Sequence, residues 1–244
     1  MHPNPSRLFR WATALTVGTA LAACGDDAPK ATPPPPPGVA VVPTVRSTDP
    51  AISKVQDYID RRSQSKDIDK SSPEWRSHLA IRPKITTFDP SKAYVWTLVT
   101  DVGSLQIRLR AAEAPDHVAA VAYLTLLGFY DGLVIHTIVP GRALESGDPA
   151  DDGKGSPGWA ISPESSDAKH DRRGLVSAVS HGPSTDDSKF RVTFAADPAL
   201  DPVCTIFGEV ETGLDTLKKL EALGSPGGKP TKRVTILKAT LSIR

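Results

Sequence analysis

Cysteine is nearly absent from this chain, which has two cysteines in 244 residues, and neither sign of charge predominates. Two cysteines are too few for a disulfide scaffold or for a zinc site made of cysteine alone. The 29 basic and 28 acidic side chains nearly cancel, so no basic excess favours nucleic acid as a partner. At about 100–200 residues per domain, the length fits one domain with additional segments, or two small domains.

The N-terminus carries an apolar run that is too short to span a bilayer, which takes about 20 apolar residues. This run, Trp11–Ala23, follows Arg7 and Arg10 and has the pattern of a signal peptide. It ends in Leu-Ala-Ala before Cys24, which resembles the lipobox of bacterial lipoproteins. We therefore expect residues 1–23 to be a lipoprotein signal peptide and Cys24 to carry the lipid. An ordinary signal peptide with an incidental cysteine is the alternative.

Proline, in contrast, is abundant, with 23 residues, of which eight lie between Gly25 and Pro50. Five in a row at Pro33–Pro37 enforce polyproline II, so residues 24–50 are predicted to be a semi-rigid tether of about 3 Å per residue. An SH3-type ligand is the alternative interpretation. Gly25 after the cysteine resembles the outer-membrane sorting pattern, although Asp26 weakens it. We expect a lipid anchor in the bacterial cell envelope, at the outer membrane facing the periplasm rather than at the inner membrane.

Residues 51–87 contain two short helical patterns. Residues 51–64 place Ile52, Val55 and Ile59 on one side of a helix. A second short helix is predicted to begin near Ser72–Trp75, with proline in its first turn. Both pieces are too small to fold alone, so we expect a helical extension that packs on the main domain through Trp75.

Alternation of apolar and polar residues predicts strands throughout residues 88–244. Helical spacing appears at 115–127 and at 213–223. Many short strands with two helices predict a β-barrel capped by helices. The predicted strands are Tyr94–Thr100, Ser104–Arg110, Val134–Val139, Gly174–Val179, Phe190–Phe194, Thr205–Val210 and Val234–Ile243.

Several local patterns do not amount to a site. Gly153–Gly158 spells G-x-G-x-x-G, but it contains Pro157 and precedes no helical pattern, which a dinucleotide loop requires. Asp148 and its acidic neighbours lack the acidic twelfth position of a calcium loop. The histidines have no metal-ligand spacing. The sequence thus implies no metal and no cofactor.

The second half of the chain contains a set of short motifs in a fixed order. They are Gly128-Phe-Tyr-Asp-Gly-Leu133, Ile135-His136, Val139-Pro-Gly141, Gly147-Asp-Pro149, Pro157-Gly158, His170-Asp-Arg-Arg-Gly174, Gly182-Pro183, Ser188-Lys-Phe190, Leu200-Asp201 and Ile206-Phe-Gly-Glu-Val210. Taken together, they resemble the cyclophilins, a family of eight-stranded barrel peptidyl-prolyl cis-trans isomerases. The resemblance covers about residues 93–244 and is nearest to bacterial envelope members. It implies a mostly β fold, a closed eight-stranded antiparallel barrel capped by two α-helices, acting as a monomer on proline-containing polypeptides.

The resemblance also shows where the family's chemistry has changed. Cyclophilins carry a catalytic arginine directly after the histidine of the central strand, and here Thr137 follows His136. A neutral hydroxyl is a poor substitute for a guanidinium with five fixed donors. No residue is therefore assigned as catalytic, and we expect a rate lower by about 10²–10³.

The family's proline pocket is altered as well. Two phenylalanines align with Arg142 and Arg191, a methionine with Ala143, and a glutamine with Glu145. One glutamate can neutralise one of the two arginines, so about one positive charge is expected to remain. A rim tryptophan aligns with Ala199. The implied substrate-binding groove consists of His136, Arg142, Ala143, Glu145, Arg191, Leu200 and Cys204.

Three interpretations remain open. The chain is an isomerase in which Arg142 or Arg191 replaces the missing arginine, with activity weak or lost. Alternatively, it is a non-catalytic module whose arginine-containing groove prefers acidic peptides. The third interpretation is a solvated ion-pair patch on a scaffolding domain. Cys204 is predicted to be a packing residue, with a regulatory thiol as the alternative.

Overall fold

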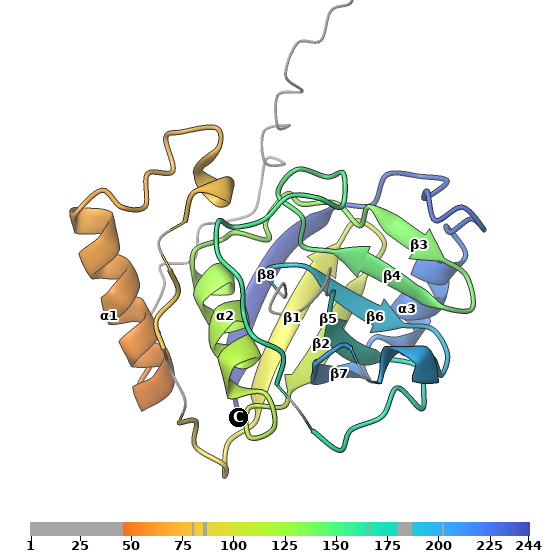
Figure 1. Cartoon of the computed structure of the whole chain (residues 1–244), viewed down its shortest axis with the longest axis horizontal. Helices are drawn as coiled ribbons and strands as arrows, with labels where there is room; N and C mark the ends of the chain where they lie inside the picture. Colours follow the sequence, from red (N-terminus) through yellow and green to blue (C-terminus); the bar gives the residue numbers. More distant parts are fainter. Residues whose placement is uncertain (1–45, 80, 85–86, 165, 180–186, 202) are drawn as a thin grey trace, which may run out of the picture. The chain divides into compact units, whose positions relative to one another are not determined.

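The computed structural model describes residues 46–79, 81–84, 87–164, 166–179, 187–201 and 203–244. The predicted signal peptide, Cys24 and nearly all of the tether lie outside the described residues. The elements, in chain order, are α1 (Pro50–Gln64), η1 (Trp75–Ser77), β1 (Tyr94–Thr100), β2 (Ser104–Leu109), α2 (Pro115–Leu126), β3 (Thr137–Val139), β4 (Ala143–Ser146), β5 (Leu175–Ala178), β6 (Phe190–Thr193), η2 (Pro198–Leu200), β7 (Ile206–Thr212), α3 (Leu214–Glu221) and β8 (Ile236–Ile243) (Figure 1).

The strands form one eight-stranded antiparallel sheet in the order β3-β4-β6-β5-β7-β2-β1-β8. The mostly β architecture is as predicted, but the prediction of a closed barrel was wrong, because β3 and β8 do not pair. Close to them, residues 132–135 and 234–236 are joined by the isolated bridge between Val134 and Thr235 and by backbone hydrogen bonds of Gly132, Leu133 and Ile135. The outer edge of β3 is instead occupied by a turn. The Ile138 N–H donates to the Gly228 carbonyl at 2.7 Å, and the Ile138 carbonyl accepts the Ser225 N–H at 3.2 Å.

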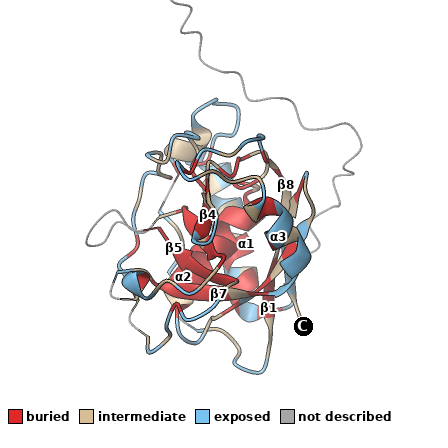
Figure 2. Ribbon diagram, turned by 90° about the vertical axis from the view of Figure 1, so that its right-hand side faces the viewer, coloured by how far each residue is buried: buried red, intermediate tan, exposed pale blue. Residues whose placement is uncertain are grey.

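Large aromatic side chains fill the core between the sheet and α2. Trp96 on β1 packs against Phe190 on β6 and against Tyr130, with ring centroids 4.9 and 5.0 Å apart. All three rings are at most 2% exposed. Buried residues follow α2 and the strands β4, β5 and β7 (Figure 2). This core fixes the strands whose outer surface carries the candidate site.

Helix α2 begins without a side-chain cap of its own. The carboxylate of Glu164, from a distant loop, accepts the backbone N–H groups of Asp116 and His117 at 2.9 and 3.0 Å. An anion at this position satisfies otherwise unpaired donors and interacts favourably with the helix dipole. Burial raises the pKa of Glu164, but hydrogen bonds from His117 and Asp116 outweigh it and hold the pKa below its ordinary value.

The N-terminal extension packs on α2. Tyr58 of α1 lies edge-on against Tyr123 of α2, with ring centroids 5.9 Å apart (Figure 1). Four residues further on, at the C-terminal end of the same helix, the Lys70 ammonium donates to the carbonyl of Leu127 at 2.7 Å. A cation at a helix C-terminus is favourable for the same electrostatic reason. Both contacts lie in the C-terminal part of α2, so the extension fixes this end of the helix.

The second predicted helix is shorter than its sequence indicated. Only the single 3-10 turn η1 forms, and Trp75 within it packs edge-on against Phe129, with ring centroids 6.3 Å apart. The Asp69 carboxylate accepts the backbone N–H of Ser71, and the Ser72 hydroxyl accepts that of Glu74. Such side-chain bonds to nearby backbone compete with a helix, which explains why the predicted one does not continue.

A single buried carboxylate joins the extension to the sheet. Oδ1 of Asp49 caps α1 by accepting the N–H groups of Ala51 and Ile52 at 3.0 and 3.1 Å. Its Oδ2 accepts the Lys92 ammonium at 2.8 Å and the Tyr94 hydroxyl at 2.9 Å. Asp49 is 2% exposed. We call this arrangement the Asp49 clasp.

Replacing Asp49 with Ala is expected to lower the free energy of unfolding by about 2–3 kcal/mol, because a helix cap and two hydrogen bonds to a charged group are lost. Urea denaturation measures the change. Asp89→Ala is the matched control, because Asp89 is exposed and lies 3.7 Å from the same Lys92. Equal effects of the two substitutions would contradict a special role for the clasp.

The same clasp predicts an acid dependence of stability. Burial raises the pKa of Asp49, but hydrogen bonds from Lys92, Ile52 and Tyr94 lower it further, so the net pKa lies below its ordinary value. The stabilisation is therefore present above the unfolded carboxyl pKa of about 4, and it is lost as pH falls through the lowered folded pKa. Denaturation at pH 7 and below pH 4 should show this loss in the wild type and a smaller one in Asp49→Ala.

Candidate functional site

Four residues from four neighbouring strands lie side by side in one row. Thr137 on β3 pairs with Glu145 on β4, Glu145 pairs with Arg191 on β6, and Arg191 pairs with Ser177 on β5. The alternating residues Ile138, Leu144, Val176 and Val192 face the core and are at most 1% exposed. Because successive side chains point to opposite faces of a sheet, the row lies on the outer face. The row thus brings together Glu145 and Arg191 of the predicted groove and Thr137, the position of the family's arginine.

The centre of this row is an ion pair. Arg191 donates from Nε and Nη2 to Oε1 of Glu145 at 3.0 and 2.5 Å. Its Nη1 lies 3.5 Å from Sγ of Cys204. The two charged side chains are only 14% and 23% exposed. All three guanidinium nitrogens of Arg191 therefore have partners within the chain.

The second arginine of the predicted groove also has an acidic partner. Arg142 donates from Nε to Oδ2 of Asp197 at 3.0 Å, and its side chain is 60% exposed. Our expectation of one uncompensated positive charge was therefore wrong, because only Glu145 had been counted. Asp197 lies three residues before Leu200 at the start of η2, next to a family motif, which is the signal that sequence reasoning missed.

The remaining groove positions are small or buried. Ala143 and Leu200 are 5% and 6% exposed. His136 is half-buried, and its Nδ1 has no hydrogen-bond partner among the residues that the structure describes. Burial lowers the pKa of His136 below its ordinary value, against the opposing effect of Asp148 and Glu145. This imidazole is therefore neutral at pH 7 and supplies no cation to the site.

Two hollows formed by the described residues lie elsewhere. One has a volume of about 400 Å³ and is lined by Phe88, Tyr94 and Arg110 among others, and the other lies beside Pro50 and Thr87. Neither contains a residue of the row. The row itself carries the ion pair of Glu145 and Arg191.

The glycine-rich segment after β4 is a loop wound around a buried carboxylate. Asp148 is fully buried and accepts the N–H groups of Ala150 and Asp152 at 2.8 and 2.9 Å, and also that of Gly153. No helix begins there, in agreement with the exclusion of a dinucleotide site. Across the described ranges, no group of three His, Cys, Asp or Glu side chains could hold a metal ion.

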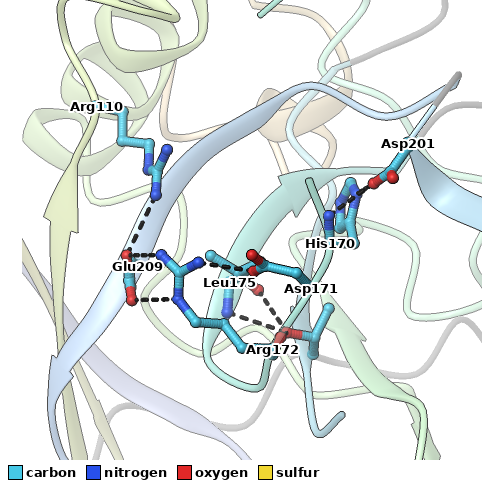
Figure 3. Close-up of polar contacts among 8 residues, drawn as sticks. Arg110, His170, Asp171, Arg172, Leu175, Asp201 and Glu209 are labelled. Atoms are coloured by element: carbon cyan, nitrogen blue, oxygen red, sulfur yellow. Dashed lines mark hydrogen bonds and ion pairs between the residues drawn. The ribbon is translucent and has the colours of Figure 1, made fainter. Parts of the chain in front are cut away.

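Two polar clusters fix the loops that border the row (Figure 3). His170 lies with Nδ1 3.0 Å from Oδ1 of Asp201, directly after Leu200, and so holds the η2 segment. Arg172 donates to both carboxylate oxygens of Glu209 at 2.9 and 2.8 Å, tying the start of β5 to β7. These bonds from Arg172, more than opposing desolvation, hold the pKa of Glu209 below its ordinary value.

A turn borders the row next to Thr137. It is closed by the N–H of Gly228, which donates to the Ser225 carbonyl at 2.9 Å. Gly228 has φ +81°, and a methyl group placed on it would lie 3.2 Å from Cγ2 of Thr137 and 3.4 Å from Cγ2 of Val139. Only glycine fits this backbone at this approach. We call residues 225–228 the β3-edge turn; the sequence analysis did not foresee its contact with Thr137.

Comparisons with known proteins agree with this arrangement. Residues 95–241 match the family described as cyclophilin type peptidyl-prolyl cis-trans isomerase/CLD. Peptidyl-prolyl cis-trans isomerase-like 2 of Cryptococcus neoformans is 36% identical over 159 residues, which are 62% of this chain and 28% of that protein. Peptidyl-prolyl cis-trans isomerase-like 3 of Gallus gallus is 38% identical over 131 residues, 52% of this chain and 81% of that protein. The chain therefore spans little more than a quarter of the first relative.

A solved structure shows the same fold. A cyclophilin type peptidyl-prolyl cis-trans isomerase of Cryptosporidium parvum has a TM-score of 0.59 and 28% identity, covering 62% of this chain and 98% of that chain. A second crystal structure of that protein was obtained in the presence of the dipeptide Ala-Pro.

Replacing Glu145 with Gln is expected to make the Cys204 thiol more reactive. Without the carboxylate, the full charge of Arg191 acts on the nearby Sγ and favours the thiolate. Alkylation of the Cys24→Ser chain at pH 7 should become up to about tenfold faster, because one pKa unit changes the thiolate fraction about tenfold. Asp197→Asn, which frees the other arginine, is the control and should leave the rate unchanged. Equal rates in all three chains would contradict the prediction.

Proposed function

Because the chain belongs to the cyclophilin-type peptidyl-prolyl cis-trans isomerase family, we propose that it is a lipid-anchored folding factor that catalyses slow isomerisation of X-Pro bonds. Its substrates would be proline-containing polypeptides, such as unfolded envelope proteins, which it would bind as a monomer. The observation that carries the proposal is the outer-face row, where the family positions Thr137, Glu145 and Arg191 lie together on β3, β4 and β6, with His136 directly before β3.

The chemistry of the reaction explains why the rate would be low. Rotation about a peptide bond has a barrier of about 18–20 kcal/mol, because the planar amide is stabilised by resonance. A catalyst must favour the twisted amide by placing a preorganised charged donor beside it. Thr137 stands at the family's arginine position and provides only a hydroxyl. The step forms no covalent bond and needs neither metal nor nucleotide.

The two groove arginines are poorly placed to replace the missing one. Arg191 is held by Glu145 and Cys204 and is 14% exposed, so turning it to an amide would break its bonds. Arg142 is exposed, but its bond to Asp197 directs it toward η2. We therefore assign both arginines to the binding surface rather than to the reaction.

The proposed location rests on the N-terminal sequence. The predicted signal peptide 1–23, lipid on Cys24 and tether 24–50 support a location in a bacterial cell envelope, at the outer membrane and facing the periplasm. Among the helices of the described residues, none has the length and apolar character needed to cross a membrane. Among the hydrogen bonds of the extension with the main domain are those to Lys92, Tyr94, Leu127, Phe129 and Pro157, none of which belongs to the row.

The substitution Thr137→Arg is expected to raise the isomerisation rate of a proline test peptide by about 10–10³, because it restores a charged donor at the family position. The measurement is cis-trans relaxation of the peptide, compared with the uncatalysed rate in the same buffer. Thr231→Arg, at an exposed position outside the groove, is the matched control for added charge. The proposed activity would be refuted if the relaxation rate with the wild type equalled the uncatalysed rate and Thr137→Arg did not increase it.

A second candidate function is a non-catalytic module that binds acidic peptides. The observation in its favour is the guanidinium of Arg142, which is 60% exposed and has only Nε engaged by Asp197. A ligand carboxylate can form a paired, charge-assisted bond with the remaining nitrogens. The internal partners Asp197 and Glu145 would compete with the ligand, so the affinity would be modest. The third interpretation, a patch of solvated ion pairs on a scaffolding domain, predicts binding of neither proline-containing substrates nor acidic peptides.

For this second function, an acidic proline-containing peptide should bind the wild type and lose most of its affinity in Arg142→Glu. Binding should weaken as salt rises from 50 to 500 mM (about 14 to 4 Å in Debye length), because the charges are exposed. Fluorescence anisotropy of a labelled peptide measures both effects. Arg233→Glu, an exposed arginine 3.4 Å from Asp151, is the control. Binding that does not change with salt would exclude this function.

A further inference from the structure

The proposed reaction needs a cation beside the amide, and the outer-face row supplies none that is free to act there. Thr137 is neutral at the position concerned, and the ion pairs of Arg191 and Arg142 direct both guanidinium groups elsewhere. His136 contributes none, because burial lowers its pKa. A cation from another element is therefore needed for any charged stabilisation of the twisted amide. The element nearest to Thr137 on its open side is the β3-edge turn.

The β3-edge turn is held rigidly against β3. Ile138 bonds to both of its ends, through Ser225 and Gly228. Gly228 is buried against the side chains of Thr137 and Val139. Because these bonds fix the backbone of the turn, they also fix the backbone position of the residue that follows Gly228, at the border of the outer-face row.

That residue is Lys229. Its carbonyl is fixed by the Ser225 hydroxyl, which donates to it at 2.8 Å, and its side chain is exposed. No hydrogen bond or ion pair engages its ammonium within the described part of the chain. A lysine side chain carries its charge about 6 Å from Cα on a flexible four-carbon stem. Consecutive Cα atoms lie about 3.8 Å apart, and a methyl group on Gly228 would lie 3.2 Å from Cγ2 of Thr137, so a side chain of this length is long enough to extend over Thr137.

We propose that Lys229 supplies the cation that stabilises the twisted amide, in place of the family's arginine at position 137. The ammonium donates to the substrate's carbonyl oxygen or to the amide nitrogen as conjugation is lost, and no bond is formed or broken. A compact, mobile point charge is less preorganised than a fixed guanidinium fork, so the catalysis is weaker than with arginine. This inference rests on the proposed isomerase activity and names the residue that performs it.

The test is the relaxation rate of a proline test peptide with the full chain and its variants. Lys229→Ala is expected to lower kcat/KM at least about tenfold, through kcat rather than KM, while Lys229→Arg retains the activity. Lys232→Ala is the matched control, because it removes an exposed lysine from the same loop, three residues further on. It should leave the rate unchanged.

A double substitution isolates the role of Lys229. When Thr137→Arg already provides the cation, adding Lys229→Ala should change kcat/KM less than about twofold, since the two charges serve the same atom and are not additive. A tenfold loss persisting in this background would overturn the inference, because the lysine would then act elsewhere.

The outcomes also separate this inference from the proposed function. Measurable wild-type activity that is equal in Lys229→Ala overturns the role of Lys229 and leaves the isomerase intact. If Arg142→Ala abolishes that activity instead, the cation is Arg142. A wild-type rate equal to solvent refutes the isomerase itself, and the inference with it. If isomerase activity is lost in Lys229→Ala but not in Lys232→Ala or Arg142→Ala, the result supports both the role of Lys229 and the isomerase function.

Discussion

The two backbone hydrogen bonds of Ile138 to the β3-edge turn are the constraint on which the site depends. A sheet edge with unpaired donors and acceptors is unstable unless it is covered. Here a turn covers it, so β3 does not pair with β8 and the sheet stays open. The same turn presses Gly228 against Thr137 and carries Lys229 to the border of the groove. Strand pairing and the chemistry of the site are thus set together.

The proposed groove carries paired charged side chains at positions where the family resemblance implies aromatic ones. The side chains of Glu145 and Arg191 are largely buried. Their hydrogen bonds to each other offset the free-energy cost of removing both charges from water. A pocket of this kind cannot enclose a proline ring as apolar side chains do. Its charged side chains can still orient a bound peptide through the polar backbone groups of that peptide. Weak catalysis with selectivity for backbone and charge is the physical expectation for such a surface.

Local sequence patterns and the family resemblance predicted most of the strands, α2, α3 and α1, because periodicity reports which face of each element is buried. They also identified Thr137, Glu145 and Arg191, which lie in one row. The partner of Arg142 and the turn beside Thr137 were missed. Both are contacts between segments about 55 and 90 residues apart along the chain, and periodicity carries no information on such pairs. Barrel closure was mispredicted because strand count does not specify which edges pair.

The Asp49 clasp has a mechanical consequence. Asp49 stands before every other described element, and its bonds run to Lys92 and Tyr94 at the start of β1. Arg46 and Ser47, just before Asp49, bond to Asp57, Asp60 and Gln56 of α1. A force applied to the described chain from Arg46 would load these bonds and then the Asp49 clasp, and would enter the sheet at β1. In the strand order β1 lies next to the end opposite β3. Such a force would therefore act on the extension and β1 before it deformed the strands of the row.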